Sequence, residues 1–323
     1  MIALAALALL LWQLRTVLVL LFGAVVTGTV IRAIAEPMTK HLRLPDGVAV
    51  LTSVLLLVAV FGGIGWLLGR EIIAQTDALT QVDDWLGTFG LAHPFQTWFA
   101  QLHSSGGTLV SRFGSWLSTA SSAAANFLIV FFGGVFLASQ PRFYRTGAIK
   151  LIPEARRGVL SQALDESEHA LRLWLKGELI AMLVIGAMTG AGLWLLGVQS
   201  WLVLGILAGF FEFIPFAGPI LSAIPGILIA LVQSPQLALW TALMYVFVQH
   251  SEAYLIQPII QQYAVDVPAV VLLFSLLAFA VLFGPIGILF AAPLCVVSYV
   301  LVKRLYVIEA LDTPTPIPGE DNS

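Results

Sequence analysis

Long apolar segments dominate the chain and predict helices that cross a membrane. A helix needs roughly 20 mostly apolar residues to span the hydrocarbon core. Segments of about this length occupy residues 17–34, 48–69, 123–139, 178–197 and 236–256. A shorter apolar segment at residues 2–13 is expected to form a partial or tilted element. The pattern predicts an all-α, polytopic transmembrane protein.

Two further apolar regions are interrupted by proline and glycine. Residues 201–232 break at 215–219, and residues 268–302 break at 284–287. Each arm of the first region has about 14 residues and reaches only ~21 Å at ~1.5 Å per residue, which is too short to cross. The second region has longer arms. We expect two re-entrant, broken-helix hairpins, because irregular backbone at this depth needs cover from protein or a watery cavity.

The two broken regions are similar in the order of their proline and glycine residues. Inverted repeats with interrupted helices often frame the binding site of a transporter, although chance similarity explains the pattern equally well. The residues expected to shape the hairpins are Pro215, Gly218, Pro219, Pro225, Pro258, Gly284, Pro285, Gly287 and Pro293.

Composition excludes most other classes of protein. The chain is 59% hydrophobic and only 10% charged, whereas a soluble domain carries about 25% charged residues. No long basic run indicates nucleic-acid binding. His250 has no second histidine four residues away, as a zinc-binding helix would need, and no phosphate-binding loop or serine elbow is present. The sequence predicts no enzyme activity, no cofactor and no metal site.

The distribution of basic residues predicts the orientation in a bacterial inner membrane. Seven of the fifteen lysines and arginines lie in residues 140–176, so this loop and the C-terminus are expected in the cytoplasm. The expected division is 1–69, N-terminal membrane segments; 70–122, an extracytoplasmic amphipathic region; 123–139, a membrane segment; 140–177, a cytoplasmic amphipathic helical loop; 178–306, the C-terminal membrane core; and 307–323, a disordered cytoplasmic tail.

Aromatic residues at helical spacing mark the outer region 70–122. Short amphipathic helices at the membrane surface or between subunits are expected there. The residues that carry this pattern are Trp85, Phe89, Phe95, Trp98, Phe99, Phe113 and Trp116.

A few polar residues at membrane depth are candidates for a solute path. Tyr245, Gln249 and Glu252 share one helical face, Gln257 follows, and Glu212 lies beside the first break. A charge at the bilayer centre costs about 2.5–3.5 kcal/mol on insertion scales, so neither glutamate is expected to face lipid. Glu252 could bind a cation, a proton or a solute hydroxyl. Alternatively, Glu252 is solvated or paired with a basic residue, and Glu212 caps free N–H groups.

Three motifs in the second half of the chain resemble the autoinducer-2 exporter family of transporters. The first is FIPFAGP at residues 213–219, followed by Ile224-Pro225. The second comprises Gln249, Glu252 and Pro258, and the third comprises Phe283-Gly284, Gly287 and Ala292-Pro293. Glu36-Pro37 also fits the family pattern, and the resemblance covers nearly the whole chain. The first hydrophobic segment looks shorter here than in the family.

The resemblance implies a secondary transporter or exporter of a small solute, such as an autoinducer-2-like signal, in contact with membrane lipid. Coupling to protons or sodium and a homo-oligomeric assembly are also implied. By resemblance, Gln249, Glu252 and Pro258 are functional positions, whereas Gly218, Pro219, Gly284 and Pro293 are structural ones. Two alternatives stay open, namely a cation/proton antiporter and a membrane scaffold that transports nothing.

Overall fold

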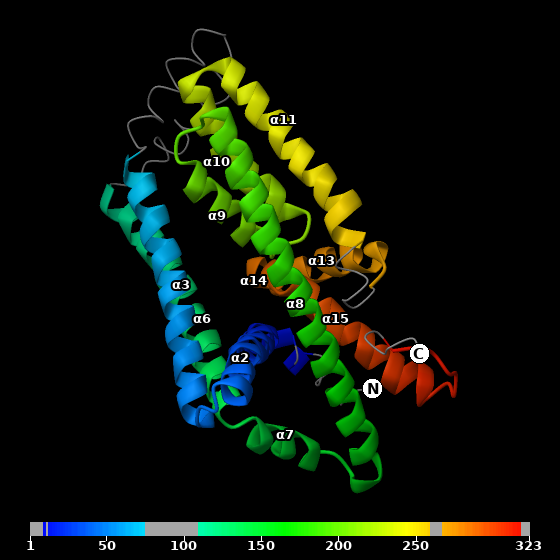
Figure 1. Cartoon of the computed structure of the whole chain (residues 1–323). Helices are drawn as coiled ribbons and strands as arrows, with labels where there is room; N and C mark the ends of the chain where they lie inside the picture. Colours follow the sequence, from blue (N-terminus) through cyan, green and yellow to red (C-terminus); the bar gives the residue numbers. More distant parts are fainter. Residues whose placement is uncertain (1–8, 11, 75–108, 259–266, 318–323) are drawn as a thin grey trace.

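The computed structural model describes residues 9–10, 12–74, 109–258 and 267–317, and this part of the chain is helical with no β-strand (Figure 1). Four stretches are long and apolar enough to cross a membrane: Arg15–His41, Asp46–Leu67, Glu154–Leu196 and Ala291–Ile308. A fifth candidate pairs Ala124–Ser139 with Pro141–Lys150, which are bent by 92°. The predicted all-α, polytopic membrane architecture is confirmed.

The long helices extend beyond the predicted apolar segments. Helix α2 is Arg15–His41, α3 is Asp46–Ala74 and α6 is Leu109–Ser139, so α6 includes the end of the predicted outer region. Trp85, Phe89, Phe95, Trp98 and Phe99 lie outside the described residues, as does most of the segment 2–13.

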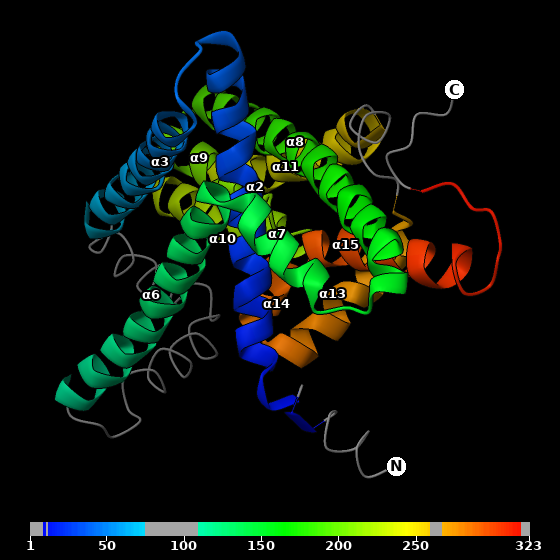
Figure 2. The ribbon, with the colours of Figure 1, turned by 90° about the horizontal axis from the view of Figure 1, so that it is seen from below.

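Helix α8, Arg157–Leu196, merges two segments that the sequence pattern separated. It is a single helix of 40 residues that contains both the amphipathic part of the 140–177 loop and the predicted segment 178–197. No proline interrupts this stretch, so the backbone hydrogen-bond ladder continues through the change from polar to apolar sequence. Helix α7, Pro141–Lys150, runs from the end of α6 towards the start of α8, as Figure 2 shows.

The first predicted break is confirmed between α9, Trp201–Phe211, and α10, Ala217–Gln233. These two short helices pack against each other and lie side by side in Figure 1. A Cβ atom at Gly218 would lie 1.9 Å from the carbonyl oxygen of Phe211, so only glycine fits at this turn. Pro225 lies inside α10.

The second predicted break is confirmed between α13, Ala269–Phe283, and α14, Pro285–Leu289. Gly284 joins them with φ 68° and ψ −149°, a conformation that is essentially restricted to glycine. Pro285 occupies the first turn of α14, where its missing N–H costs no hydrogen bond. The chain returns through α15, Ala291–Val302, in which Pro293 is buried, and continues as a π-helix at Lys303–Ile308.

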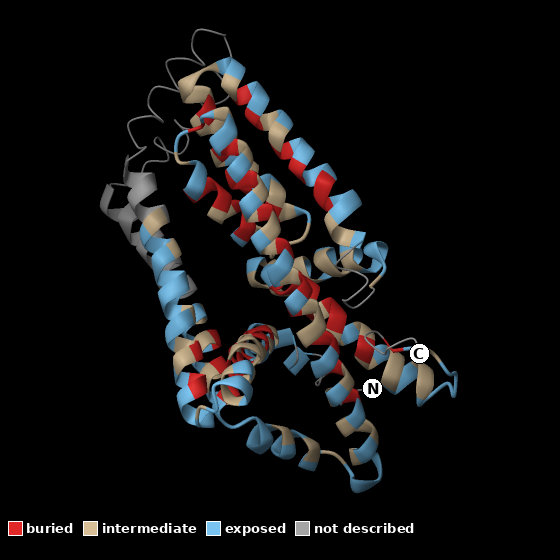
Figure 3. Cartoon of the chain, in the orientation of Figure 1, coloured by how far each residue is buried: buried red, intermediate tan, exposed pale blue. Residues whose placement is uncertain are grey.

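Helix α8 is the element around which the C-terminal half packs, since it contacts α9, α11, α15 and α2. Helix α11, Pro235–Ser251, ends earlier than the predicted segment 236–256 because a π-helix follows at Glu252–Ile256. Figure 3 shows buried residues concentrated where these helices meet, whereas α3 is largely exposed along its described length. Its exposed apolar side chains, such as Leu55 and Phe61, suit contact with lipid.

Part of the predicted C-terminal tail contacts the helices at its last described residues. Ile317 is only 5% exposed and contacts a cluster formed by Ala170, Val296 and Val300. The Lys303 ammonium group donates a hydrogen bond of 3.1 Å to the carbonyl oxygen of Pro316. Burial of this isoleucine contributes about 1.5–3 kcal/mol to holding the segment against α8 and α15.

We predict that Gly218→Ala destabilises the protein by at least about 1–3 kcal/mol, the usual cost of forcing extra volume into a packed site. The matched control is Gly62→Ala in α3, where a new Cβ would meet nothing within 4 Å. Thermal unfolding of the purified protein in detergent measures both. Equal melting temperatures for the two variants would contradict the tight turn at the first break.

Candidate functional site

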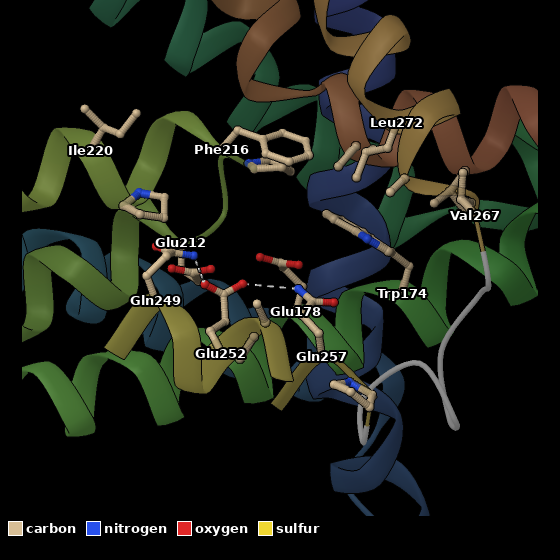
Figure 4. Close-up of a pocket in the computed structure, with 18 residues that line it drawn as sticks. Trp174, Glu178, Glu212, Phe216, Ile220, Gln249, Glu252, Gln257, Val267 and Leu272 are labelled. Carbon is tan, nitrogen blue, oxygen red and sulfur yellow. Dashed lines mark hydrogen bonds between the residues drawn. The ribbon is translucent and has the colours of Figure 1, made fainter. Parts of the chain in front are cut away.

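A cavity of about 610 Å³ lies where the two hairpins, α8 and the end of α11 meet (Figure 4). Ligand sites in proteins commonly enclose volumes of this order. The cavity is lined by Trp174, Glu178, Ala181, Glu212, Pro215, Phe216, Pro219, Ile220, Gln249, Glu252, Ala253, Gln257, Pro258, Val267, Ala269, Leu272, Ala292 and Val296.

Three carboxyl groups from three different elements enter this cavity. Glu178 comes from α8, Glu212 from the break after α9, and Glu252 from the first position of the π-helix. Glu212 and Glu252 are each only 8% exposed, and both line the cavity together with Glu178. None of the described residues that line the cavity is lysine, arginine or histidine. The carboxyl groups therefore lack the basic partner that usually accompanies a buried charge.

Two amide side chains hold the carboxyl group of Glu252 in place. The Gln249 side-chain amide donates a hydrogen bond to one carboxyl oxygen of Glu252. The Gln257 amide donates to the other oxygen at 3.3 Å. Figure 4 draws both bonds at the centre of the cavity. These contacts leave Glu252 oriented but do not neutralise its charge.

The π-helix explains why Gln257 reaches Glu252. Residues five positions apart do not share a face of an α-helix, but a π-helical turn closes between residues i and i+5. The backbone N–H of Gln257 accordingly donates to the carbonyl oxygen of Glu252. The turn thereby places both side chains on the cavity side. Such single π-turns are frequent at functional sites.

The four polar residues selected from the sequence, Glu212, Gln249, Glu252 and Gln257, all line this one cavity. Tyr245, which shared their predicted face, does not line it and instead packs against Gly226 on α10. Glu252 is buried, and among the described residues its hydrogen-bond partners are the amides of Gln249 and Gln257 rather than a basic side chain. Glu212 does not cap α10, whose start has no side-chain cap.

Proline and glycine positions divide between the cavity wall and the backbone turns. Pro215, Pro219 and Pro258 line the cavity. Gly218, Gly284 and Gly287 shape the turns, and a Cβ atom at Gly287 would lie 2.1 Å from the carbonyl oxygen of Phe279. Pro225, Pro285 and Pro293 lie within helices away from the lining.

Sequence reasoning missed Glu178 and Trp174. Glu178 stood at the predicted start of an apolar segment, where a charged residue normally marks the membrane surface. Because α8 continues through this point, Glu178 instead faces the cavity together with Trp174, one helical turn earlier. The i, i+4 spacing of these two residues was the available signal.

Comparison with known proteins supports one family assignment. A family model described as "AI-2E family transporter" matches residues 1–306. The chain is 26% identical to YrrI, a candidate transport protein of Bacillus subtilis, with 82% of this chain and 81% of that protein covered. It is 27% identical to the candidate transport protein MT0215 of Mycobacterium tuberculosis, with 91% and 85% covered.

A shorter match links the chain to a protein named as a permease. It is 25% identical to the candidate permease PerM of Escherichia coli K12, over 50% of this chain and 46% of PerM. The family model, by contrast, spans nearly all of the sequence, including every residue that lines the cavity. The chain belongs to the AI-2E family of transporters.

Proposed function

We propose that this protein is a proton-coupled secondary transporter whose solute site is the cavity between the two hairpins. The single observation that carries the proposal is that three glutamates line one cavity, two of them buried, with no lysine, arginine or histidine among its described lining residues. Several carboxyl groups crowded into one buried space favour holding a proton, because burial and mutual repulsion disfavour their negative charges. That proton is available for exchange with a solute or a cation.

Electrostatics supports proton exchange at this place. Burial and mutual repulsion disfavour three negative charges in one small space, as in paired carboxylates that share a proton. Glu178 adds a third carboxyl group that interacts with both of the others. Binding of a positive charge would favour release of a proton from this cluster, so occupancy and proton movement would be coupled.

Broken helices give this site the features of an alternating-access transporter. Interrupted helices from two hairpins near a central site are a recurrent arrangement in secondary transporters. We propose that the hairpins enter from opposite faces, that the 140–177 loop and the C-terminus face the cytoplasm, and that the host membrane is the bacterial inner membrane. The basic residues of the loop support this orientation. We also propose that the protein assembles as a homo-oligomer and catalyses no chemical reaction.

Cation/proton antiport is the second candidate function. The same three carboxyl groups favour it, because carboxylates bind sodium as well as protons. Export of an autoinducer-2-like signal and a scaffold role without transport are the further alternatives. Flux measurements separate them, since a scaffold predicts no movement of protons, sodium or signal.

We predict that the cavity is open to water at Glu178. In a Cys295→Ala background, Glu178→Cys should react with a charged methanethiosulfonate reagent within minutes. Leu183→Cys on the same helix is the control, because Leu183 is an exposed apolar residue in a stretch suited to lipid. Mass spectrometry measures the labelled fraction. Labelling of Leu183→Cys but not of Glu178→Cys would contradict the assignment of the cavity.

We predict that Glu252→Gln reduces coupled proton flux about ten- to a hundredfold, because hydrogen bonds to charged groups contribute about 1.5–3 kcal/mol. Proteoliposomes with an internal pH dye measure proton movement driven by a sodium gradient or by autoinducer-2. Glu309→Gln is the control, since Glu309 is exposed and outside the cavity. Wild-type flux in the Glu252→Gln variant would remove Glu252 from the mechanism.

A further inference from the structure

We propose that the cavity takes an organic cation, a protonated amine that carries an apolar or aromatic body. This inference rests on the proposed transport function and names its solute class. The two ends of the cavity differ in chemistry, and two aromatic side chains in its wall have defined positions.

The polar end of the cavity is suited to a positive charge. Glu178, Glu212 and Glu252 supply carboxyl oxygens from three separate elements. Gln249 and Gln257 direct their amide N–H groups to Glu252, so their carbonyl oxygens stay available as acceptors. An ammonium group has only donors to satisfy, and this end offers mainly acceptors. An anionic solute would meet only like charges here.

The apolar end of the cavity does not suit a bare metal ion as the only solute. Trp174, Phe216, Val267 and Leu272 line the cavity beyond the carboxyl groups, as Figure 4 shows. An alkali cation or a polyol would gain nothing from this surface and would lose hydration against it. A cavity of about 610 Å³ also exceeds the space that a single ion needs. An apolar body attached to the charged group fits both ends at once.

The two aromatic side chains are held in defined positions. Phe216 has φ 63°, which is a rare and costly conformation for a bulky residue and is typically retained at functional sites. The indole ring of Trp174 packs edge-on against Phe213, with ring centroids 5.8 Å apart. Tryptophan is the aromatic residue that attracts cations best through its ring face. Trp174 lies one helical turn from Glu178, so both can contact one ammonium group.

Charge balance links this solute class to the proposed proton coupling. One ammonium group that enters the carboxyl cluster brings a single positive charge. Release of one proton from the carboxyl cluster then restores the original charge of the cavity. The exchange is electroneutral and needs no further reactant.

The test uses three probes with the same ring and chain length but different charge. Phenethylamine is a cation, 2-phenylethanol is neutral and phenylacetate is an anion. Isothermal titration calorimetry on the full-length protein in detergent measures their binding. Phenethylamine should bind at least about tenfold more tightly than 2-phenylethanol, corresponding to ~1.4 kcal/mol. Phenylacetate should not bind. Equal binding of all three probes, or tightest binding of phenylacetate, would overturn the proposal.

Two variants locate the binding within the cavity. Trp174→Ala should weaken phenethylamine about two- to thirtyfold, the range of a cation–π contact, and Trp174→Phe should restore part of the loss. Trp194→Ala is the matched control, because Trp194 is an exposed tryptophan on the same helix that does not line the cavity. A melting temperature for each variant shows that it is folded. An equal loss in the Trp194→Ala control would also overturn the proposal.

Failure of this proposal is distinguishable from failure of the transport function. If phenethylamine does not bind while sodium or autoinducer-2 still drives proton flux, the solute class is wrong and the transport function stands. If phenethylamine binds as expected but no gradient of it moves protons in proteoliposomes, the site is correct and the coupled transport is wrong.

Discussion

The close approach of α8 and α9 determines the geometry of the whole C-terminal half. Gly186 and Gly190 on α8 face Gly205 and Gly209 on α9, and a Cβ atom at Gly205 would lie 2.7 Å from the Cα of Gly190. Small residues let helix backbones approach closely where lipid provides no hydrophobic drive. Because α9 is fixed on α8 in this way, the break that follows α9 presents Glu212 to the same space as Glu178.

Acidic side chains have different partners inside and outside the cavity. Away from the cavity, basic and acidic side chains form ion pairs between helices, such as Arg172 with Glu36 at 2.6 Å and Arg32 with Asp46 at 2.6 Å. These pairs connect α2 to α8 and to α3 at partly exposed positions, where each contributes little to stability. In the cavity, by contrast, no described lining residue is basic, and the Glu252 carboxyl group accepts hydrogen bonds from the amides of Gln249 and Gln257. The contrast supports a functional rather than a structural role for the buried glutamates.

Irregular backbone occurs where the proposed function needs it. The break after α9 brings Glu212 to the cavity, and the π-helix after α11 brings the Gln257 side chain to Glu252. Non-helical backbone at membrane depth is tolerated where it lines a cavity. In this protein the same turns that interrupt the helices therefore also line the proposed solute site.

Hydrophobic pattern by itself determined the helical membrane class, the positions of both breaks and four of the polar residues that line the cavity. These features are local, because segment length, proline and glycine act on their own stretch of chain. The continuity of α8 was not predictable, since its amphipathic and apolar halves have different patterns but one uninterrupted backbone.

Tertiary structure alone decided the composition of the site. Glu178 and Trp174 join it through helix packing, the π-helix brings in Gln257, and Tyr245 packs against Gly226 on α10 instead. Ile317 is ordered by a surface made of α8 and α15, which no property of the polar tail encodes. A sequence pattern fixes which residues share a helical face, whereas the partner of that face depends on how distant helices pack.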